Sequence, residues 1–188
     1  GGTDHTDHSQ SEIEDGFTQD DEFKLNADGD IQFKMYVENG RTSSGTKYPR
    51  SELRELLANG TTKAAWDSGS GTHYMQGRSR IDHVPSAKPW VVFFQAHDAE
   101  SDLARVQLED GAIVCRRTPA SGSEIRTVIK TSYSIGTWIA WEMRFESGTM
   151  TIKLDGTTVL TASGMGKTGC YFKTGCYNQV STAADGGG

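Results

Sequence analysis

The stretch MTIKLDGTTVLTA, residues 150–162, carries the clearest fold signal in the chain. Apolar and polar residues alternate around Asp155-Gly156, as they do in a strand that buries one face. Asp-Gly is a favoured pair for the two-residue turn between antiparallel strands, because both turn positions need positive φ. The stretch therefore predicts a β-hairpin.

Further short strand-like segments, separated by turn signals, lie along the rest of the chain. They are expected at residues 30–38, 50–56, 72–84, 90–98, 104–110, 112–118, 124–133, 138–147 and 170–180. About ten short strands without alternating helices favour an all-β protein, an antiparallel sandwich of two sheets. The segment SELRELLAN (51–59) is open to a second interpretation, a short helix, which its local propensity favours.

The composition is that of one domain with an ample core. A mean hydropathy of −0.56 predicts a soluble protein, and no apolar run approaches the roughly 18 residues of a membrane-spanning helix. Residues 1–30 hold ten acids and one lysine; the net charge is −6, so residues 31–188 carry +3. A polyanionic partner is therefore compatible with the chain, whereas no basic cluster predicts a nucleic-acid partner.

The N-terminal segment differs from the rest of the chain. Residues 1–22 are polar and acidic and are expected to be a loop or disordered, while residues 23–188 are expected to form the domain. No signal peptide is present; we expect a secreted or periplasmic protein from which it has been removed.

The three cysteines, Cys115, Cys170 and Cys176, are an odd number. In a continuous strand Cys170 and Cys176 lie about 20 Å apart, too far for a disulfide. A bridge through Cys115 and three free thiols both remain open.

Three of the predicted strands carry an unusual polar face, because side chains two residues apart share a face of a strand. The grouped residues are Tyr171, Lys173, Tyr177 and Gln179 in YFKTGCYNQ (171–179), Arg50, Glu52 and Arg54 in RSELRE (50–55), and Gln95 and His97 in WVVFFQAHD (90–98). A salt-bridged surface strand would also explain RSELRE, and a histidine ending a buried strand is usually structural. Together the three faces form a candidate binding surface.

Arginine, glutamine, histidine, lysine and tyrosine together suit the cleavage of a polyuronate by β-elimination. The enzyme must neutralise the carboxylate at C5 so that the C5 proton becomes acidic. A base then removes this proton, and an acid protonates the departing O4. Histidine titrates near ~6.5 and tyrosine near ~10, and neighbouring Arg and Lys would lower the tyrosine pKa. This chemistry needs no metal or other cofactor.

The same segments carry a resemblance to a known family. RSELRE, QAH (95–97) and YFKTGCYNQ resemble, in this order, the signature segments of polysaccharide lyase family 7, the alginate lyases. The similarity covers nearly the whole chain, and the third segment is the most specific. The resemblance implies a β-jelly roll of two antiparallel sheets with the substrate in a groove on the concave sheet. It also implies cleavage of the 1,4-glycosidic bond of alginate, which leaves 4,5-unsaturated uronate ends.

The resemblance implies a role for each matching residue. Arg50, Gln95 and His97 bind and neutralise the carboxylate. Tyr177 is the proton donor, and also the base where the sugar geometry demands it; His97 is the base for the opposite geometry. The residues expected to border the same subsite are Arg54, Glu52, Lys173, Gln179 and Tyr171.

Two positions depart from the family pattern. Ala96 stands where the family has Ile or Val, a position associated with the choice between guluronate and mannuronate, and is expected to point away from the groove. Thr174 replaces an alanine, a mild change. Compared with the family, the chain is also expected to lack an opening strand before residue 1 and a closing strand after residue 188, which would expose sheet edges.

Two other functions remain open. A lyase of the same fold could act on glucuronan or another polyuronate, and a non-catalytic carbohydrate-binding module could use the same jelly roll. A binding module would not need His97 and Tyr177 on one surface. A two-carboxylate hydrolase is disfavoured, because the acids of SEIED (11–15) lie in the polar N-terminal segment and no other pair of acids lies on a predicted core strand. The predicted partner is an anionic polysaccharide, and we expect a monomer.

Overall fold

The computed structural model describes residues 7–18, 22–38 and 47–181. These residues form one short helix, α1 (Gln10–Glu14), and twelve strands. The strands are β1 (Phe23–Leu25), β2 (Ile31–Phe33), β3 (Arg50–Arg54), β4 (Thr72–Arg80), β5 (Trp90–His97), β6 (Asp102–Glu109), β7 (Ala112–Arg117), β8 (Ile125–Lys130), β9 (Trp138–Glu146), β10 (Thr149–Leu154), β11 (Thr157–Ala162) and β12 (Tyr171–Asn178). Among them no helix is long and apolar enough to cross a membrane.

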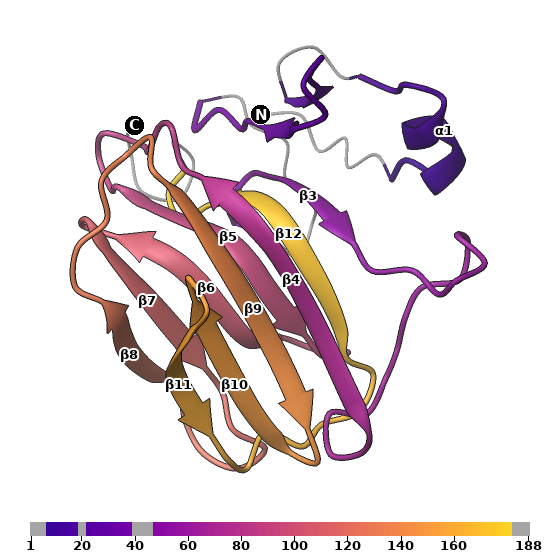
Figure 1. The fold of residues 1–188 in the computed structure, drawn as a ribbon, viewed down its shortest axis with the longest axis vertical. Helices are drawn as coiled ribbons and strands as arrows, with labels where there is room; N and C mark the ends of the chain where they lie inside the picture. Colours follow the sequence, from indigo (N-terminus) through magenta and orange to yellow (C-terminus); the bar gives the residue numbers. More distant parts are fainter. Residues whose placement is uncertain (1–6, 19–21, 39–46, 182–188) are drawn as a thin grey trace.

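Two antiparallel sheets pack face to face (Figure 1). The larger sheet has six strands in the order β3-β12-β5-β6-β7-β8, and the smaller has four in the order β11-β10-β9-β4. The β1–β2 pair and α1 lie at one end of this sandwich, at the top of Figure 1. Strands distant in sequence are neighbours in both sheets, as the all-β sandwich prediction requires.

The core lies between the two sheets. In β9 and β10 buried and less buried residues alternate strictly, because the outer face of the smaller sheet meets solvent. Phe94 of β5 stacks on Trp141 of β9, with ring centroids 4.2 Å apart and planes 8° from parallel. Gly77 of β4 leaves room for the Trp141 ring, which a Cβ at this position would approach to 2.8 Å. This contact joins the centres of the sheets.

The predicted hairpin is confirmed. β10 pairs with β11 through Asp155-Gly156, whose φ angles are 48° and 80°. Two further predicted turns have the same form, since Asp110, Gly111, Ser147 and Gly148 all have positive φ. The helical interpretation of SELRELLAN is wrong: Arg50–Arg54 is a strand that pairs with β12. Tertiary pairing overrides its helix propensity.

The N-terminal part departs from the prediction in two places. Residues 10–14, expected to be a loop, form α1, which a capping box between Ser9 and Glu12 stabilises. Strand β1 was not expected, and the segment 30–38 is a strand only over Ile31–Phe33. Both strands are three residues long, too short for a clear alternation.

All three cysteines are free. Cys115 is buried within β7, and burial raises the pKa of its thiol and that of Cys176 to about 12. Both thiols are therefore protonated near neutral pH, which makes them poor nucleophiles.

We expect Phe94→Ala to destabilise the protein by about 3–5 kcal/mol, because it removes the ring that stacks on Trp141 and leaves a cavity between the sheets. Val128→Ala, at a β8 position that is 43% exposed, is the control and should change stability by less than about 1 kcal/mol. Urea unfolding measures both. Equal losses of stability in the two variants would mean that the ring stack does not hold the sheets together.

Candidate functional site

The three polar segments form neighbouring strands of the larger sheet. β12 lies between β3 and β5, so YFKTGCYNQ is flanked by RSELR on one side and WVVFFQAH on the other. Lys173 is opposite Arg54 on β3 and Gln95 on β5. Tyr177 is opposite Arg50, and Tyr171 is opposite His97. The sheet therefore brings together residues that are up to 127 positions apart.

These side chains share the outer face of the sheet, the face turned away from the core. Phe172, Phe94 and Ala96, which alternate with them, belong to the core cluster instead. Because Ala96 belongs to the core cluster, it points away from the outer face as expected. We call the outer face over β3, β12 and β5 the site face; it carries Arg50, Glu52, Arg54, Gln95, His97, Tyr171, Lys173 and Tyr177.

Two register shifts shape the site face. β5 contains one extra residue relative to β6 between Val92 and Phe94, and both Phe93 and Phe94 pack in the core. β12 contains an extra residue relative to β5 between Thr174 and Tyr177. Gly175 lies in this bulge with φ 151°, where a Cβ would approach the Ser51 carbonyl oxygen to 2.3 Å. Only glycine fits there.

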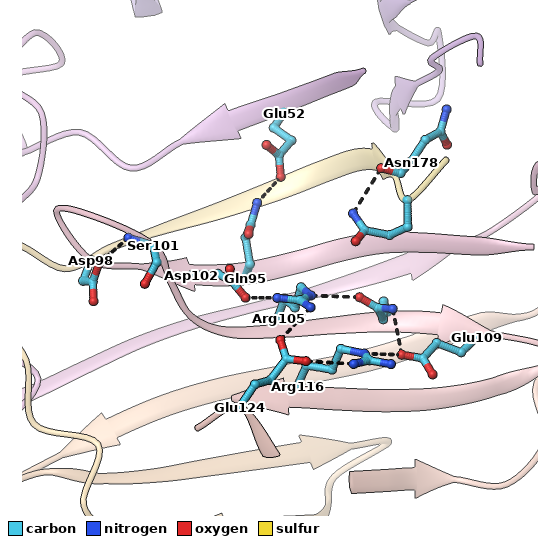
Figure 2. A network of polar contacts seen from close by, with 12 residues as sticks. Glu52, Gln95, Asp98, Ser101, Asp102, Arg105, Glu109, Arg116, Glu124 and Asn178 are labelled. Carbon is cyan, nitrogen blue, oxygen red and sulfur yellow. Dashed lines mark hydrogen bonds and ion pairs between the residues drawn. The ribbon is translucent and has the colours of Figure 1, made fainter. Parts of the chain in front are cut away.

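Glu52 lies at the centre of the site face. Its side chain is 3% exposed and is flanked by three polar partners. Gln95 donates from Nε2 to Oε1 at 2.5 Å, Lys173 forms an ion pair with Oε2, and Arg50 Nη1 lies 3.8 Å from Oε2 (Figure 2 shows the contact with Gln95). Burial lowers the pKa of Lys173, and the neighbouring Glu52 carboxylate opposes this shift.

Each arginine of the site face lies over a tyrosine ring. Arg50 Cζ is 4.0 Å from the centroid of Tyr177, and Arg54 Cζ is 3.5 Å from that of Tyr171. Such contacts are favourable because the ring face carries negative potential. His97 also stacks on Tyr171, with ring centroids 5.3 Å apart. Burial raises the pKa of Tyr171, which keeps this phenol protonated near neutral pH.

The hydrogen bonding of His97 defines its neutral form. Nδ1 lies 2.7 Å from the carbonyl oxygen of Asp98, which can only accept. Nδ1 therefore carries the proton, and Nε2 holds the lone pair of the neutral ring. A histidine in this form can accept a proton at Nε2.

Sequence reasoning missed an ion-pair network on the same sheet. Three arginines lie in one row across the sheet that begins at Gln95: Arg105 on β6 is opposite Gln95, Arg116 on β7 is opposite Arg105, and Arg126 on β8 is opposite Arg116. They are paired with three acids, at 2.7 Å for Arg105–Glu124, 2.6 Å for Arg116–Glu109 and 2.7 Å for Arg126–Glu109, and Arg105 also contacts Asp102. Figure 2 shows the contacts of Arg105 and Arg116. No short motif marks this network, since it depends on the register of four strands.

The two halves of the sheet therefore differ in charge. The network over β6–β8 matches three arginines with three acids and is neutral overall. The site face has three cations, Arg50, Arg54 and Lys173, and one buried carboxylate, Glu52. Its excess positive charge makes the β3–β12–β5 half the one that favours an anion.

Gln179 is the predicted site residue that lies outside the strands. It follows the end of β12 and is 9% exposed. Its side-chain Nε2 donates to the Asn178 carbonyl at 3.1 Å, and its backbone N–H donates to Trp90. β12 ends at Asn178, and the bond from the Gln179 N–H to Trp90 continues the pairing with β5 by one residue. Within the described ranges, no group of three or more His, Cys, Asp or Glu residues could hold a metal ion.

The fold and the site face define a class: an all-β sandwich protein with a cationic, tyrosine- and histidine-bearing sheet face that suits an extended anionic ligand. A family profile described as alginate lyase matches residues 2–188. The chain belongs to the alginate lyase family.

Solved structures of alginate lyases share this fold. AlgAT5, from polysaccharide lyase family 7, is 32% identical with a TM-score of 0.82, over 94% of this chain and 79% of that one. The Corynebacterium sp. alginate lyase is 31% identical with a TM-score of 0.83, over 94% and 77%. A1-II′, solved in complex with its product GGG, is 24% identical with a TM-score of 0.81, over 94% and 82%. The jelly-roll prediction is confirmed.

A curated alginate lyase of Klebsiella pneumoniae is 38% identical over 74 residues. This match covers 39% of the present chain and 21% of the Klebsiella protein.

We expect Gly175→Ala to lower both stability and activity, because the new Cβ would collide with the Ser51 carbonyl and push β3 away from β12. Gly122→Ala is the matched control: its φ is 118°, but no atom lies within 4 Å of the added Cβ. The control should show only the backbone strain, about 1–2 kcal/mol. Thermal unfolding and initial rates on alginate for each variant would measure the two effects, and identical behaviour of the two variants would contradict the close approach of β12 to β3.

Proposed function

We propose that this protein cleaves the 1,4-glycosidic bond of alginate by β-elimination and leaves a 4,5-unsaturated uronate at the new non-reducing end. The observation that carries the proposal is the site face of a chain in the alginate lyase family: it combines three cations, an imidazole with a lone pair at Nε2 and a phenol beside a guanidinium. The A1-II′ complexes with product GGG and with substrate GGMG support an oligouronate as the ligand of this fold.

In the proposed reaction, Arg50, Gln95 and His97 neutralise the C5 carboxylate. Arg50 is only loosely paired, at 3.8 Å from Glu52, so its guanidinium can donate to a substrate oxygen. Gln95 uses one amide hydrogen for Glu52 and has a second hydrogen to offer. Neutralising this carboxylate stabilises the enolate-like charge that develops when the C5 proton leaves.

Tyr177 would protonate the departing O4. The Arg50 guanidinium lies 4.0 Å from the centroid of its ring, so a positive charge is close to the phenol that donates the proton. Where the C5 proton and O4 lie on the same side of the sugar, Tyr177 serves as base and acid in turn. Where they lie on opposite sides, Nε2 of His97 accepts the C5 proton.

The other residues of the site face position these groups and border the subsite. Glu52 holds Gln95 and Lys173, Tyr171 contacts both Arg54 and His97, and Lys173 adds positive charge for further carboxylates. Gln179 supports the end of β12 beside Trp90. The groups proposed for the chemistry are all side chains of the protein.

A lyase acting on glucuronan or another polyuronate is the second candidate, since any C5 carboxylate would meet the same cations. A carbohydrate-binding module is less well supported, because binding alone does not need a lone pair on His97 next to a cation–phenol pair. An extracellular or periplasmic location and a monomeric state are proposed with the function.

We expect incubation with alginate to produce near-ultraviolet absorbance from the new C4–C5 double bond. The same assay is run on polymannuronate, polyguluronate and glucuronan, so that the rates on the candidate substrates are compared directly. A rise in reducing ends without this absorbance would make the protein a hydrolase. Binding of alginate with neither signal would favour the binding module.

We expect Tyr177→Phe to reduce turnover by about 10²-fold or more, because it removes the proton that the departing O4 receives while the ring under Arg50 remains. Tyr171→Phe is the matched control, since this ring also lies under an arginine, and it should keep most of the activity. Initial rates on alginate and circular dichroism of both variants are compared. Near-normal turnover in a folded Tyr177→Phe protein would exclude the proton-transfer role.

A further inference from the structure

Asp98, the residue after His97, is buried and bonded at both carboxylate oxygens. Oδ1 accepts the backbone N–H of Glu100 at 2.8 Å and that of Ser101 at 2.6 Å, and the Asp98 N–H donates to the Ser101 carbonyl at 2.8 Å. These bonds close the turn between β5 and β6 (Figure 2 shows Asp98 and Ser101). The side chain therefore fixes the peptide group whose carbonyl contacts His97.

Lys167, in the connection between β11 and β12, holds the other oxygen. Its Nζ lies 2.8 Å from Oδ2 of Asp98, and the two side chains are 22% and 8% exposed. The backbone of Lys167 is held in turn by Ser68: Lys167 N–H donates to Ser68 Oγ at 2.8 Å, and Ser68 N–H donates to the Lys167 carbonyl at 2.9 Å. The lysine is thus anchored before its side chain reaches Asp98.

Asp98 is ionised near neutral pH despite its burial. Burial opposes ionisation, but the Lys167 hydrogen bond and the N–H groups of Ser101 and Glu100 outweigh it and hold the pKa of Asp98 below its ordinary value. A buried ion pair contributes little net stability compared with an apolar pair of similar size. What an apolar pair could not supply is the fixed orientation of the Asp98 peptide group.

We propose that Asp98 and Lys167 are positioning residues that keep the Asp98 carbonyl on Nδ1 of His97 and so fix the tautomer with the lone pair on Nε2. The chain of contacts runs from Ser68 through Lys167 and Asp98 to His97. Stacking on Tyr171 restrains the plane of the ring but does not distinguish its two nitrogens. The catalytic meaning of this tautomer rests on the proposed function, whereas the tautomer itself does not.

The test is the ring tautomer of His97, measured by long-range ¹H–¹⁵N spectra at a pH where the ring is neutral. The wild-type protein should show one form, with hydrogen on Nδ1. Asp98→Ala, which removes the turn bonds, should populate both forms. Asp98→Asn keeps an oxygen for the Glu100 and Ser101 N–H groups and should restore the wild-type spectrum in large part.

Lys167→Met removes the anchor and leaves the turn residues in place, so it should shift the tautomer less than Asp98→Ala does. Its matched control is Lys153→Met, which breaks a Lys–Glu142 pair of 3.0 Å between β10 and β9 and should leave the His97 spectrum unchanged. If Asp98→Ala does not fold, Lys167→Met and Asp98→Asn carry the comparison. An unchanged His97 spectrum in Asp98→Ala would overturn the proposal; if that variant does not fold, an unchanged spectrum in Lys167→Met would do so. A change in Lys153→Met as large as that in Lys167→Met would also overturn it.

On alginate, Asp98→Ala should lower kcat by about 10-fold or more with little change in KM, as with other groups that orient a functional histidine. Asp98→Asn should recover most of this loss. A wild-type protein that fails to cleave any polyuronate, while Asp98→Ala still changes the tautomer, would refute the proposed function alone. Cleavage by the wild type with an unaltered tautomer in Asp98→Ala would refute the positioning role alone.

Discussion

The buried carboxylate of Glu52 is the interaction on which the site depends. It comes from β3, pairs with Lys173 of β12 and accepts a hydrogen bond from Gln95 of β5, so one side chain ties together the three strands of the site face. Removing one partner of such a buried pair typically costs about 3–5 kcal/mol, because the other charge is left uncompensated. An apolar replacement of the whole group could keep the strands together, but it would not orient the amide of Gln95 or leave Arg50 loosely held. The polar centre is thus better explained by the orientation that it gives to its neighbours than by stability.

The surroundings of this centre are set by backbone geometry and by charge. The bulge at Gly175 lets β12 follow β3 closely while its register against β5 changes, so that Tyr177 and Lys173 both reach the face that carries Gln95. On the other half of the sheet, Arg105, Arg116 and Arg126 are matched by acids. Arginines that are already paired bidentately or in networks have less to offer a ligand. The sheet therefore presents one cationic end and one neutral end to an extended polyanion.

Part of this structure could be predicted from local patterns in the sequence. Asp155-Gly156 predicts its hairpin because positive φ restricts the residue types, and the alternation in the polar segments places most of the site face correctly. The rest depends on contacts between distant segments. The bulge at Phe93 and the pairing of Asp98 with Lys167, 69 residues away, follow from register and loop packing, which no local pattern encodes. Gln179, one residue past the end of β12, lies where strand alternation alone does not fix the direction of the side chain.

The register also bears on how two proton-transfer groups could serve one sugar. Tyr177 is level with Val92 on β5, whereas His97 lies five residues further along that strand, with one bulged residue between them. Their backbones are therefore about 13 Å apart along the sheet, at ~3.3 Å per residue. The row of Gln95 and Lys173 lies between them. In the proposed reaction a uronate bound over Gln95 would have Tyr177 at one end and His97 at the other. Such an arrangement allows removal of the C5 proton from either side without movement of the sheet, provided that the tautomer of His97 is fixed in advance.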